Sequence, residues 1–187
     1  MKIGVLSLQG GFIEHIKSIE SIGHEAIEVK EAYQLNKLDA LILPGGESTT
    51  IGKLLRITGL MEPLKERIKE GLPVWGTCAG MILLAKEIEG EEIPHLALMD
   101  ISVKRNAFGR QIDSFETFEK VKGLDEPIEL IFIRAPYISE YGNDVEILCT
   151  VDNKIVAARE RNMLVTSFHP ELTDNTNFLN YFIEKLC

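Results

Sequence analysis

Short apolar runs alternate with amphipathic stretches through the first half of the chain. The strand-like runs cover residues 2–8, 25–29, 39–43 and 73–76, and helical spacing covers about 11–22, 49–60 and 62–70. Residues 41–43 and 74–75 are apolar at consecutive positions, as strands buried on both faces require. Strands that alternate with helices in this way predict a parallel sheet covered by helices on both faces.

The second half predicts several short strands and one last helix. The strands lie near residues 99–103, 115–120, 130–133, 145–151, 155–159 and 163–167. We interpret them as hairpins added to the sheet. The last helix begins at about Asp174, a candidate N-cap, and carries one apolar stripe through Phe178, Phe182 and Leu186. The sequence therefore predicts an α/β fold with a mostly parallel central sheet and added β-hairpins.

Length and composition indicate one globular unit. A chain of 187 residues is long enough for one buried core and short for two, so we expect a single domain over residues 1–187. No apolar run approaches the roughly 18 residues that span a bilayer, which argues against a membrane protein. The first residues read as a strand and lack the features of a signal peptide. We expect a cytoplasmic protein.

The charged and metal-binding residue types exclude several functions. A net charge of −9 opposes binding to nucleic acid, because phosphate binding needs a basic face. The three cysteines are widely spaced and form no Cys-x-x-Cys pair, so neither a disulfide framework nor a zinc site is expected. The four histidines are scattered, which gives no support for a metal or another cofactor. For His15, His24 and His95 we expect surface or packing roles.

Cys78 lies in a pattern typical of a nucleophile elbow. The run Gly76-Thr77-Cys78-Ala79-Gly80 follows a short apolar strand and opens what we expect to be an amphipathic helix. Flanking glycines suit a sharp strand-to-helix turn, because the crowded backbone leaves little room for side chains. A helix N-terminus also favours thiolate over thiol. The alternative is a buried structural cysteine, the role we expect for Cys149.

A histidine and a carboxylate follow another apolar strand near the end of the chain. His169 and Glu171 are two residues apart, so they can point the same way from an extended backbone. A thiol nucleophile needs a base, and the base needs a partner on its other ring nitrogen. Cys78, His169 and Glu171 fill these three roles. Taken alone, such a pair is more often a strand-end histidine beside a solvated glutamate than a catalytic pair.

Two glycine-containing loops follow strand ends at the edge where α/β proteins bind ligands. One contains Gln9 and the other runs from Pro44 through Gly45, Gly46, Glu47 and Ser48 to Thr50. The second loop caps the next helix, but capping alone leaves the glycine pair unexplained. Acyl transfer through a thioester needs donors for an oxyanion. The backbone N–H groups of Ala79 and Gly46 are the natural candidates.

These motifs together resemble the triad-type (class I) glutamine amidotransferases, and among them the glutaminase subunits of pyridoxal 5′-phosphate synthase. The resemblance rests on residues 76–80 and 167–171, and it is narrowed by residues 8–10, 44–50, 103–111 and 114–116. It covers essentially the whole chain. It implies a flavodoxin-like three-layer α/β/α sandwich.

The resemblance also implies a reaction and a substrate site. Cys78 attacks the side-chain amide of L-glutamine, His169 acts as base and then as acid for departing ammonia, and Glu171 orients His169. The glutamine site would be formed by Gly46, Glu47, Ser48, Arg105, Ile133 and Arg134, with Gln9 near the oxyanion hole. By the same resemblance, ammonia passes to a (β/α)₈-barrel synthase subunit in a large hetero-oligomer that makes the vitamin B6 cofactor, and the glutaminase works mainly in that complex.

Three alternatives remain open at this point. The first is a glutaminase of another pathway, such as histidine biosynthesis. The second is a cysteine hydrolase or chaperone of the DJ-1-like type, against which the run 167–171 argues. The third is a scaffolding subunit that keeps the fold without the activity, which the intact Cys78, His169 and Glu171 disfavour.

Overall fold

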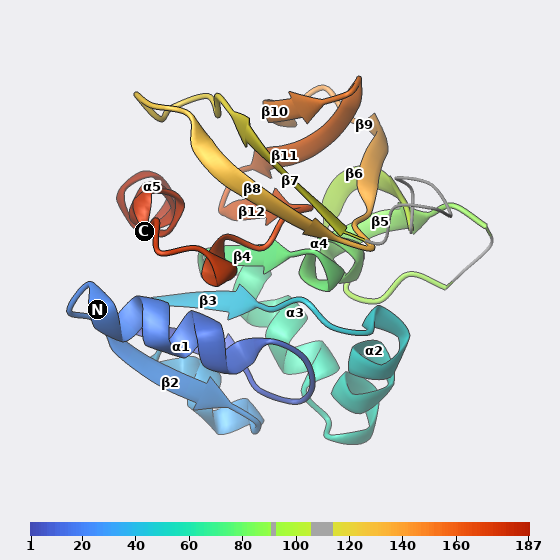
Figure 1. Cartoon of the computed structure of the whole chain (residues 1–187). Coiled ribbons are helices and arrows are strands. Elements are labelled where there is room, and N and C mark those ends of the chain that lie inside the picture. The colour runs from blue at the N-terminus through green and yellow to red at the C-terminus, as the bar shows by residue number, and fades with distance from the viewer. Residues whose placement is uncertain (91–92, 106–113) are drawn as a thin grey trace.

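The computed structural model describes residues 1–90, 93–105 and 114–187 (Figure 1). Its first half contains β1 (Lys2–Leu6), α1 (Phe12–Ser21), β2 (Glu25–Val29), η1 (Ala32–Lys37), β3 (Ala40–Leu43), α2 (Ser48–Ile57), α3 (Met61–Lys69), β4 (Val74–Thr77) and α4 (Ala79–Leu84). Its second half contains β5 (Ala85–Ile88), β6 (Met99–Lys104), β7 (Ser114–Glu119), β8 (Ile128–Ile133), β9 (Tyr137–Tyr141), β10 (Glu146–Val151), β11 (Lys154–Glu160), β12 (Met163–Thr166), η2 (Pro170–Leu172) and α5 (Asn177–Leu186).

The strands form one mixed sheet and a separate hairpin. Within the described ranges, the order in the sheet is β2-β1-β3-β4-β12-β11-β9-β6-β5, and β10 pairs with β11. The five strands from β2 to β12 are parallel to one another, whereas β11 pairs antiparallel with β12, β9 and β10. Strands β7 and β8 form the hairpin. The predicted α/β fold, with a mostly parallel sheet and added hairpins, is confirmed.

Helices cover both faces of the sheet because its central strands are apolar on both sides. In β3, Leu41 and Leu43 pack with α2, α3 and α4 on one face. Ala40 and Ile42 point to the other face, where the core includes side chains of α1, α5 and the β7–β8 hairpin. Figure 1 shows this hairpin crossing over β11 and β12. The three-layer arrangement therefore follows from strands buried on both sides.

Several local expectations differ from the structure. The helix after Cys78 is not amphipathic: all six residues of α4 are buried, since α4 packs between the sheet and α2. The last helix has Thr176, not Asp174, at its N-cap, and the Asn177 N–H donates to Asn175 Oδ1 at 2.8 Å. η1, β5 and β9 were not expected from the sequence. β5 includes Glu87, the first residue of an acidic stretch whose residues 91–92 lie outside the described residues.

Within the described part of the chain, no helix is long and apolar enough to cross a membrane.

Candidate active site

Cys78 occupies a sharp turn between β4 and α4, as the elbow pattern predicts. Its backbone has φ 48° and ψ −101°, a region that residues other than glycine rarely adopt. The Cys78 N–H donates to the carbonyl of Thr166 on β12 at 2.7 Å. Such a conformation costs about 1–3 kcal/mol and persists only when its surroundings enforce it. The neighbouring strand therefore helps to hold the nucleophile turn in place.

The two glycines of the elbow are required by close backbone packing. A Cβ on Gly80 would lie 2.1 Å from the carbonyl oxygen of Leu43, and one on Gly76 would lie 2.5 Å from the carbonyl of Gly80. Real Cβ atoms do not approach backbone this closely. The sequence interpretation, which assigned the glycines to backbone crowding, is confirmed.

We expect Gly80→Ala to lower the free energy of unfolding by about 3 kcal/mol, because the backbone of β3 and α4 must move apart. Urea denaturation followed by circular dichroism measures this change. Gly11→Ala is the matched control, since a Cβ at Gly11 finds no neighbouring atom closer than 3.7 Å. A Gly80→Ala protein as stable as the wild type would show that the elbow tolerates a side chain.

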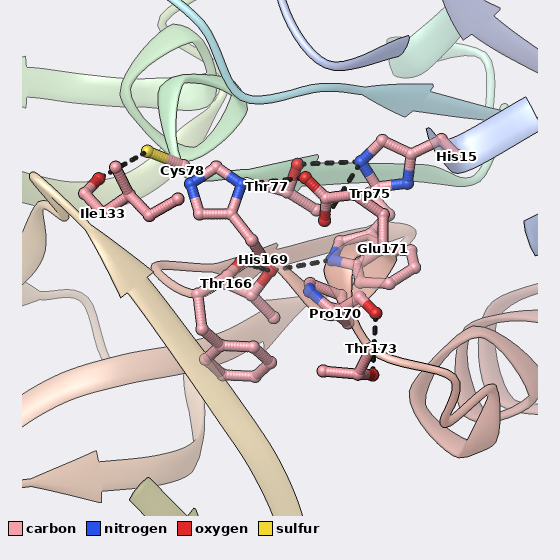
Figure 2. A network of polar contacts seen from close by, with 11 residues as sticks. His15, Trp75, Thr77, Cys78, Ile133, Thr166, His169, Pro170, Glu171 and Thr173 are labelled. Atoms are coloured by element: carbon pink, nitrogen blue, oxygen red, sulfur yellow. Dashed lines mark hydrogen bonds and ion pairs between the residues drawn. The ribbon is translucent and has the colours of Figure 1, made fainter. Parts of the chain in front are cut away.

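His169 and Glu171 follow β12 and form a hydrogen-bonded pair. The His169 Nδ1 and Glu171 Oε1 atoms are 2.8 Å apart. The expected extended backbone is wrong for Glu171, because Pro170 starts the 3-10 turn η2, which contains Glu171. The backbone N–H of His169 donates a hydrogen bond to the carbonyl oxygen of Ile131 at 2.8 Å, which connects the turn to β8. Figure 2 shows the imidazole between Cys78 and the Glu171 carboxylate.

The strand order explains how Cys78 meets His169. Strands β4 and β12 are parallel neighbours, and Thr77 pairs with Thr166. The residues after both strands therefore emerge at the same sheet edge. The side chain of Cys78 is buried, and its Sγ lies 4.0 Å from the carbonyl oxygen of Ile133.

Burial and charge act in opposite directions on the His169–Glu171 pair. Burial disfavours the imidazolium, but interactions with Cys78 and Glu171 outweigh it and raise the pKa of His169. Burial likewise disfavours the carboxylate, but His15 and His169 outweigh it and lower the pKa of Glu171. The site therefore favours a charged imidazolium beside a charged carboxylate.

The glycine pair of the β3–α2 loop makes room for protein groups. A Cβ on Gly45 would lie 2.5 Å from His169 Cε1, and one on Gly46 would lie 2.6 Å from Gln9 Oε1. The Gly11 N–H donates to the Gly45 carbonyl at 3.0 Å, and the Glu47 N–H donates to Gln9 Oε1 at 2.9 Å. The glycines that helix capping leaves unexplained thus let this loop pack against His169 and the β1–α1 loop.

Glu47 caps α2 and contacts Arg105. Its carboxylate accepts hydrogen bonds from the N–H groups of Thr49 and Thr50 at 3.1 and 2.7 Å. The Thr50 hydroxyl also donates to it, and these bonds lower the pKa of Glu47 to about 2. Arg105 Nη2 lies 3.2 Å from Glu47 Oε1. The expected capping role of this loop is confirmed.

We expect Glu47→Ala to lower the free energy of unfolding by about 1 kcal/mol at pH 7, the usual contribution of an N-cap. Because the pKa of Glu47 is depressed, its contribution is complete above the ordinary glutamate pKa of about 4.5 and is lost as the pH falls towards about 2. Urea denaturation at pH 7 and at pH 3 measures the difference. Glu20→Ala, at an exposed position of α1, should change stability by less than about 0.5 kcal/mol.

One cavity of about 580 Å³ brings all the residues expected at the site together. It is lined by Gln9, Gly46, Glu47, Ser48, Cys78, Ala79, Arg105, Ile133, Arg134, His169 and Glu171, and also by Gly11, Glu14, Gly45, Ile82 and Leu172. Its volume is in the range of small-molecule sites. Residues 106–111 of the motif that follows Arg105 lie outside the described residues.

His15 was expected to have a surface or packing role, and its buried ring does pack against Trp75. Its contacts with Glu171 and Thr77, from the same face of α1 as Ile19, were not expected from the sequence. A polar residue within the apolar stripe of an amphipathic helix is the signal that could have identified it. Among the described residues, no group of three or more His, Cys, Asp or Glu side chains is placed to hold a metal ion.

Comparison with known proteins identifies the family. The model of the SNO glutamine amidotransferase family matches residues 5–187. The chain belongs to this family. The SNO-family chain is 63% identical over 186 residues to a protein of Clostridium beijerinckii named pyridoxal 5′-phosphate synthase subunit PdxT, covering 99% of the chain and 98% of that relative. It is 56% identical over 188 residues to the subunit of the same name from Carboxydothermus hydrogenoformans, covering 100% and 98%.

Solved structures agree with this assignment of the SNO-family chain. A crystal structure described as a glutamine amidotransferase superposes with a TM-score of 0.93 at 47% identity and covers 97% of each chain. A structure described as a putative GMP synthase subunit from Thermoplasma acidophilum has a TM-score of 0.68 at 18% identity, covering 98% of this chain and 90% of that one. The second likeness concerns the fold alone. The resemblance to glutamine amidotransferases inferred from the sequence motifs is confirmed.

Proposed function

We propose that this chain hydrolyses L-glutamine to L-glutamate and ammonia, and that it supplies the ammonia to a pyridoxal 5′-phosphate synthase subunit for vitamin B6 biosynthesis. The observation that carries the proposal is the meeting of Cys78, His169 and Glu171 in one cavity. The names of the relatives support the pathway. They favour it over the histidine-biosynthesis alternative.

The proposed reaction proceeds through a thioester. The Cys78 thiolate attacks the side-chain amide carbon of glutamine, and the resulting oxyanion accepts hydrogen bonds from the N–H groups of Ala79 and Gly46. The amide C–N bond then breaks, and the His169 imidazolium donates its proton to the departing ammonia. Neutral His169 next removes a proton from water, which hydrolyses the thioester to glutamate and regenerates Cys78. Throughout, Glu171 orients His169 through the 2.8 Å contact at Nδ1.

Charged groups around the cavity suit the amino acid end of glutamine. Arg105 offers a guanidinium for the α-carboxylate, since arginine binds carboxylates with paired hydrogen bonds. The carboxylate of Glu47 stays charged at neutral pH and suits the α-ammonium group. We assign Gly46, Ser48, Ile133 and Arg134 to the remaining wall of the glutamine site, which they line together.

We infer that the synthase partner controls the oxyanion hole through the β1–α1 and β3–α2 loops. The Gly45 carbonyl oxygen accepts a hydrogen bond from the backbone N–H of Gly11. The Gly45–Gly46 peptide is trans, so the Gly46 N–H points away from Gly11. A partner that contacts the Gln9 loop could therefore reorient the Gly45–Gly46 peptide. Crystal structures with the same peptide orientation in the free chain and in the complex would contradict this gating.

The partner and the assembly are also part of the proposal. We propose a (β/α)₈-barrel synthase subunit as the ammonia acceptor, within a large hetero-oligomer, and residues 1–187 as a single glutaminase domain. One continuous sheet, from β2 to β5 among the described strands, supports the single domain. The expected cytoplasmic location stays a prediction.

Glutamate release from L-glutamine tests the proposed function. The purified chain is assayed alone and after mixing with the pyridoxal 5′-phosphate synthase barrel subunit from the same genome. We expect hydrolysis to rise strongly on mixing. Absence of hydrolysis in both states would refute the vitamin B6 assignment, and the glutaminase acceptors of other pathways would be tested next.

A further inference from the structure

His15 is a buried polar side chain that no step of the proposed reaction uses. Its relative exposure is 2%, and its ring meets Trp75 edge-on. Its Nε2 atom lies 3.2 Å from Thr77 Oγ1 and 3.5 Å from Glu171 Oε2. Figure 2 shows His15 on the side of Glu171 away from His169. His15 thus reaches both the glutamate of the triad and the residue directly before the nucleophile.

His15 faces the second carboxylate oxygen of Glu171. Oε1 contacts His169, whereas Oε2 is buried and has no hydrogen-bond partner of standard geometry among the described residues. The 3.5 Å contact with His15 is slightly long, but catalytic hydrogen bonds are often long without substrate and tighten in the complex. A neighbouring cavity of about 10 Å³ has room for at most about one water molecule. Glu171 Oε2 is therefore shielded from bulk solvent in the folded chain.

We propose that His15 is a positioning residue that holds Glu171 through Nε2–H and completes a chain from Cys78 through His169 and Glu171. The inference rests on the proposed function. An ionised carboxylate only accepts hydrogen bonds, so the proposed role requires the tautomer of His15 that carries the proton on Nε2, where the Thr77 hydroxyl oxygen is a second acceptor. Each oxygen then faces a different histidine, so rotation of the carboxylate would break both contacts, and the His15 contact favours the orientation in which Oε1 meets His169 Nδ1.

The charge state of His15 suits this role. Burial lowers the pKa of His15; the carboxylates of Glu171 and Glu14 oppose the shift, and His169 adds to it. A neutral imidazole orients the carboxylate and leaves its negative charge available to the His169 imidazolium. A positively charged His15 would instead compete with His169 for that charge.

Two amide substitutions separate positioning from packing. The amide nitrogen of a glutamine lies near the place of histidine Nε2, whereas that of an asparagine lies near Nδ1. We therefore compare His15→Gln with His15→Asn, which have the same chemistry but a different reach. The readout is the rate of iodoacetamide alkylation at Cys78, followed by site-resolved mass spectrometry from pH 5 to pH 9 on the free chain. This measurement needs neither glutamine turnover nor the synthase subunit.

We expect His15→Asn to slow alkylation at Cys78 by about tenfold near pH 6 and to move the pH profile to higher pH. The size is taken by analogy from the roughly 10- to 100-fold effects of removing side chains that orient metal-ligating residues. We expect His15→Gln to restore most of the rate. A wild-type profile in His15→Asn would overturn the proposal, and so would equal losses in both variants, because packing alone would then explain them. If the wild-type chain hydrolyses no glutamine with the synthase but the two variants still differ, the proposed function fails and the positioning role stands.

Discussion

We expect Cys78→Ala to lower glutamine hydrolysis in the complex with the synthase by at least about 10⁴-fold, because the variant lacks the atom that forms the thioester. The fold should persist, since alanine fills less space than cysteine and keeps the backbone N–H that donates to Thr166. Glutamate release measures the activity, and circular dichroism with thermal unfolding measures the fold. A variant that retains turnover would exclude Cys78 as the nucleophile. If the chain were a scaffolding subunit without activity of its own, Cys78→Ala would change neither glutamate release nor the fold.

Cys149→Ala is the matched control for this experiment. Cys149 is buried in β10, and burial raises the pKa of its thiol to about 11, so it is protonated and unreactive at neutral pH. It does not line the cavity that contains Cys78. The control should keep wild-type turnover per folded molecule. A loss equal to that of Cys78→Ala would indicate a general effect of removing a cysteine.

Glu171→Gln is the second substitution with a large expected effect. The amide keeps the size of the side chain but removes the negative charge that offsets the cost of burying the His169 imidazolium. We expect kcat to fall by about 10²- to 10⁴-fold, in line with the loss of the equivalent carboxylate in other triads. Because Glu171 helps to raise the pKa of His169, the pH profile of kcat/KM should also change. Both quantities follow from glutamate release in the complex between pH 5 and pH 10.

The same exchange at Glu146 provides the control. Glu146 forms ion pairs with Arg159 and Lys122 at the β10–β11 hairpin and does not line the active-site cavity. Glu146→Gln should leave kcat and its pH profile unchanged. If Glu171→Gln behaves like this control, Glu171 does not orient the base.

The strands β5 and β9 were not predicted, because the sequence patterns that would indicate them are short. β5 has four residues and lies last in the sheet order, with two exposed positions between two buried ones. Such a strand shows no alternation that distinguishes it from a loop. β9 pairs with β11 through one residue pair and has a single fully buried position, Ile138. Pairing with neighbours, rather than its own pattern, makes it a strand.

Parts of the site were predictable because their chemistry is local in sequence. The elbow around Cys78 needs glycines at fixed positions, and the turn after β12 contains both His169 and Glu171. Each pattern therefore appears within a few residues. The apolar stripe of α1 marks His15 as a buried polar residue, but not its contacts, because its partners Thr77 and Glu171 belong to distant segments.

The sequence by itself determined the order of helices and strands in the parallel half, the elbow, and the residue types of a thiol-based acyl transfer. Periodicity and steric demands at glycine act over a few residues, so they can be read along the chain. Only the tertiary structure decided that β12 lies beside β4, that β8 holds the His169 turn, and that α1 brings His15 to Glu171. These contacts join segments far apart in sequence. β12 and β4 pair through backbone hydrogen bonds, whereas α1 and the β7–β8 hairpin come near the site because they cover a buried face of the sheet.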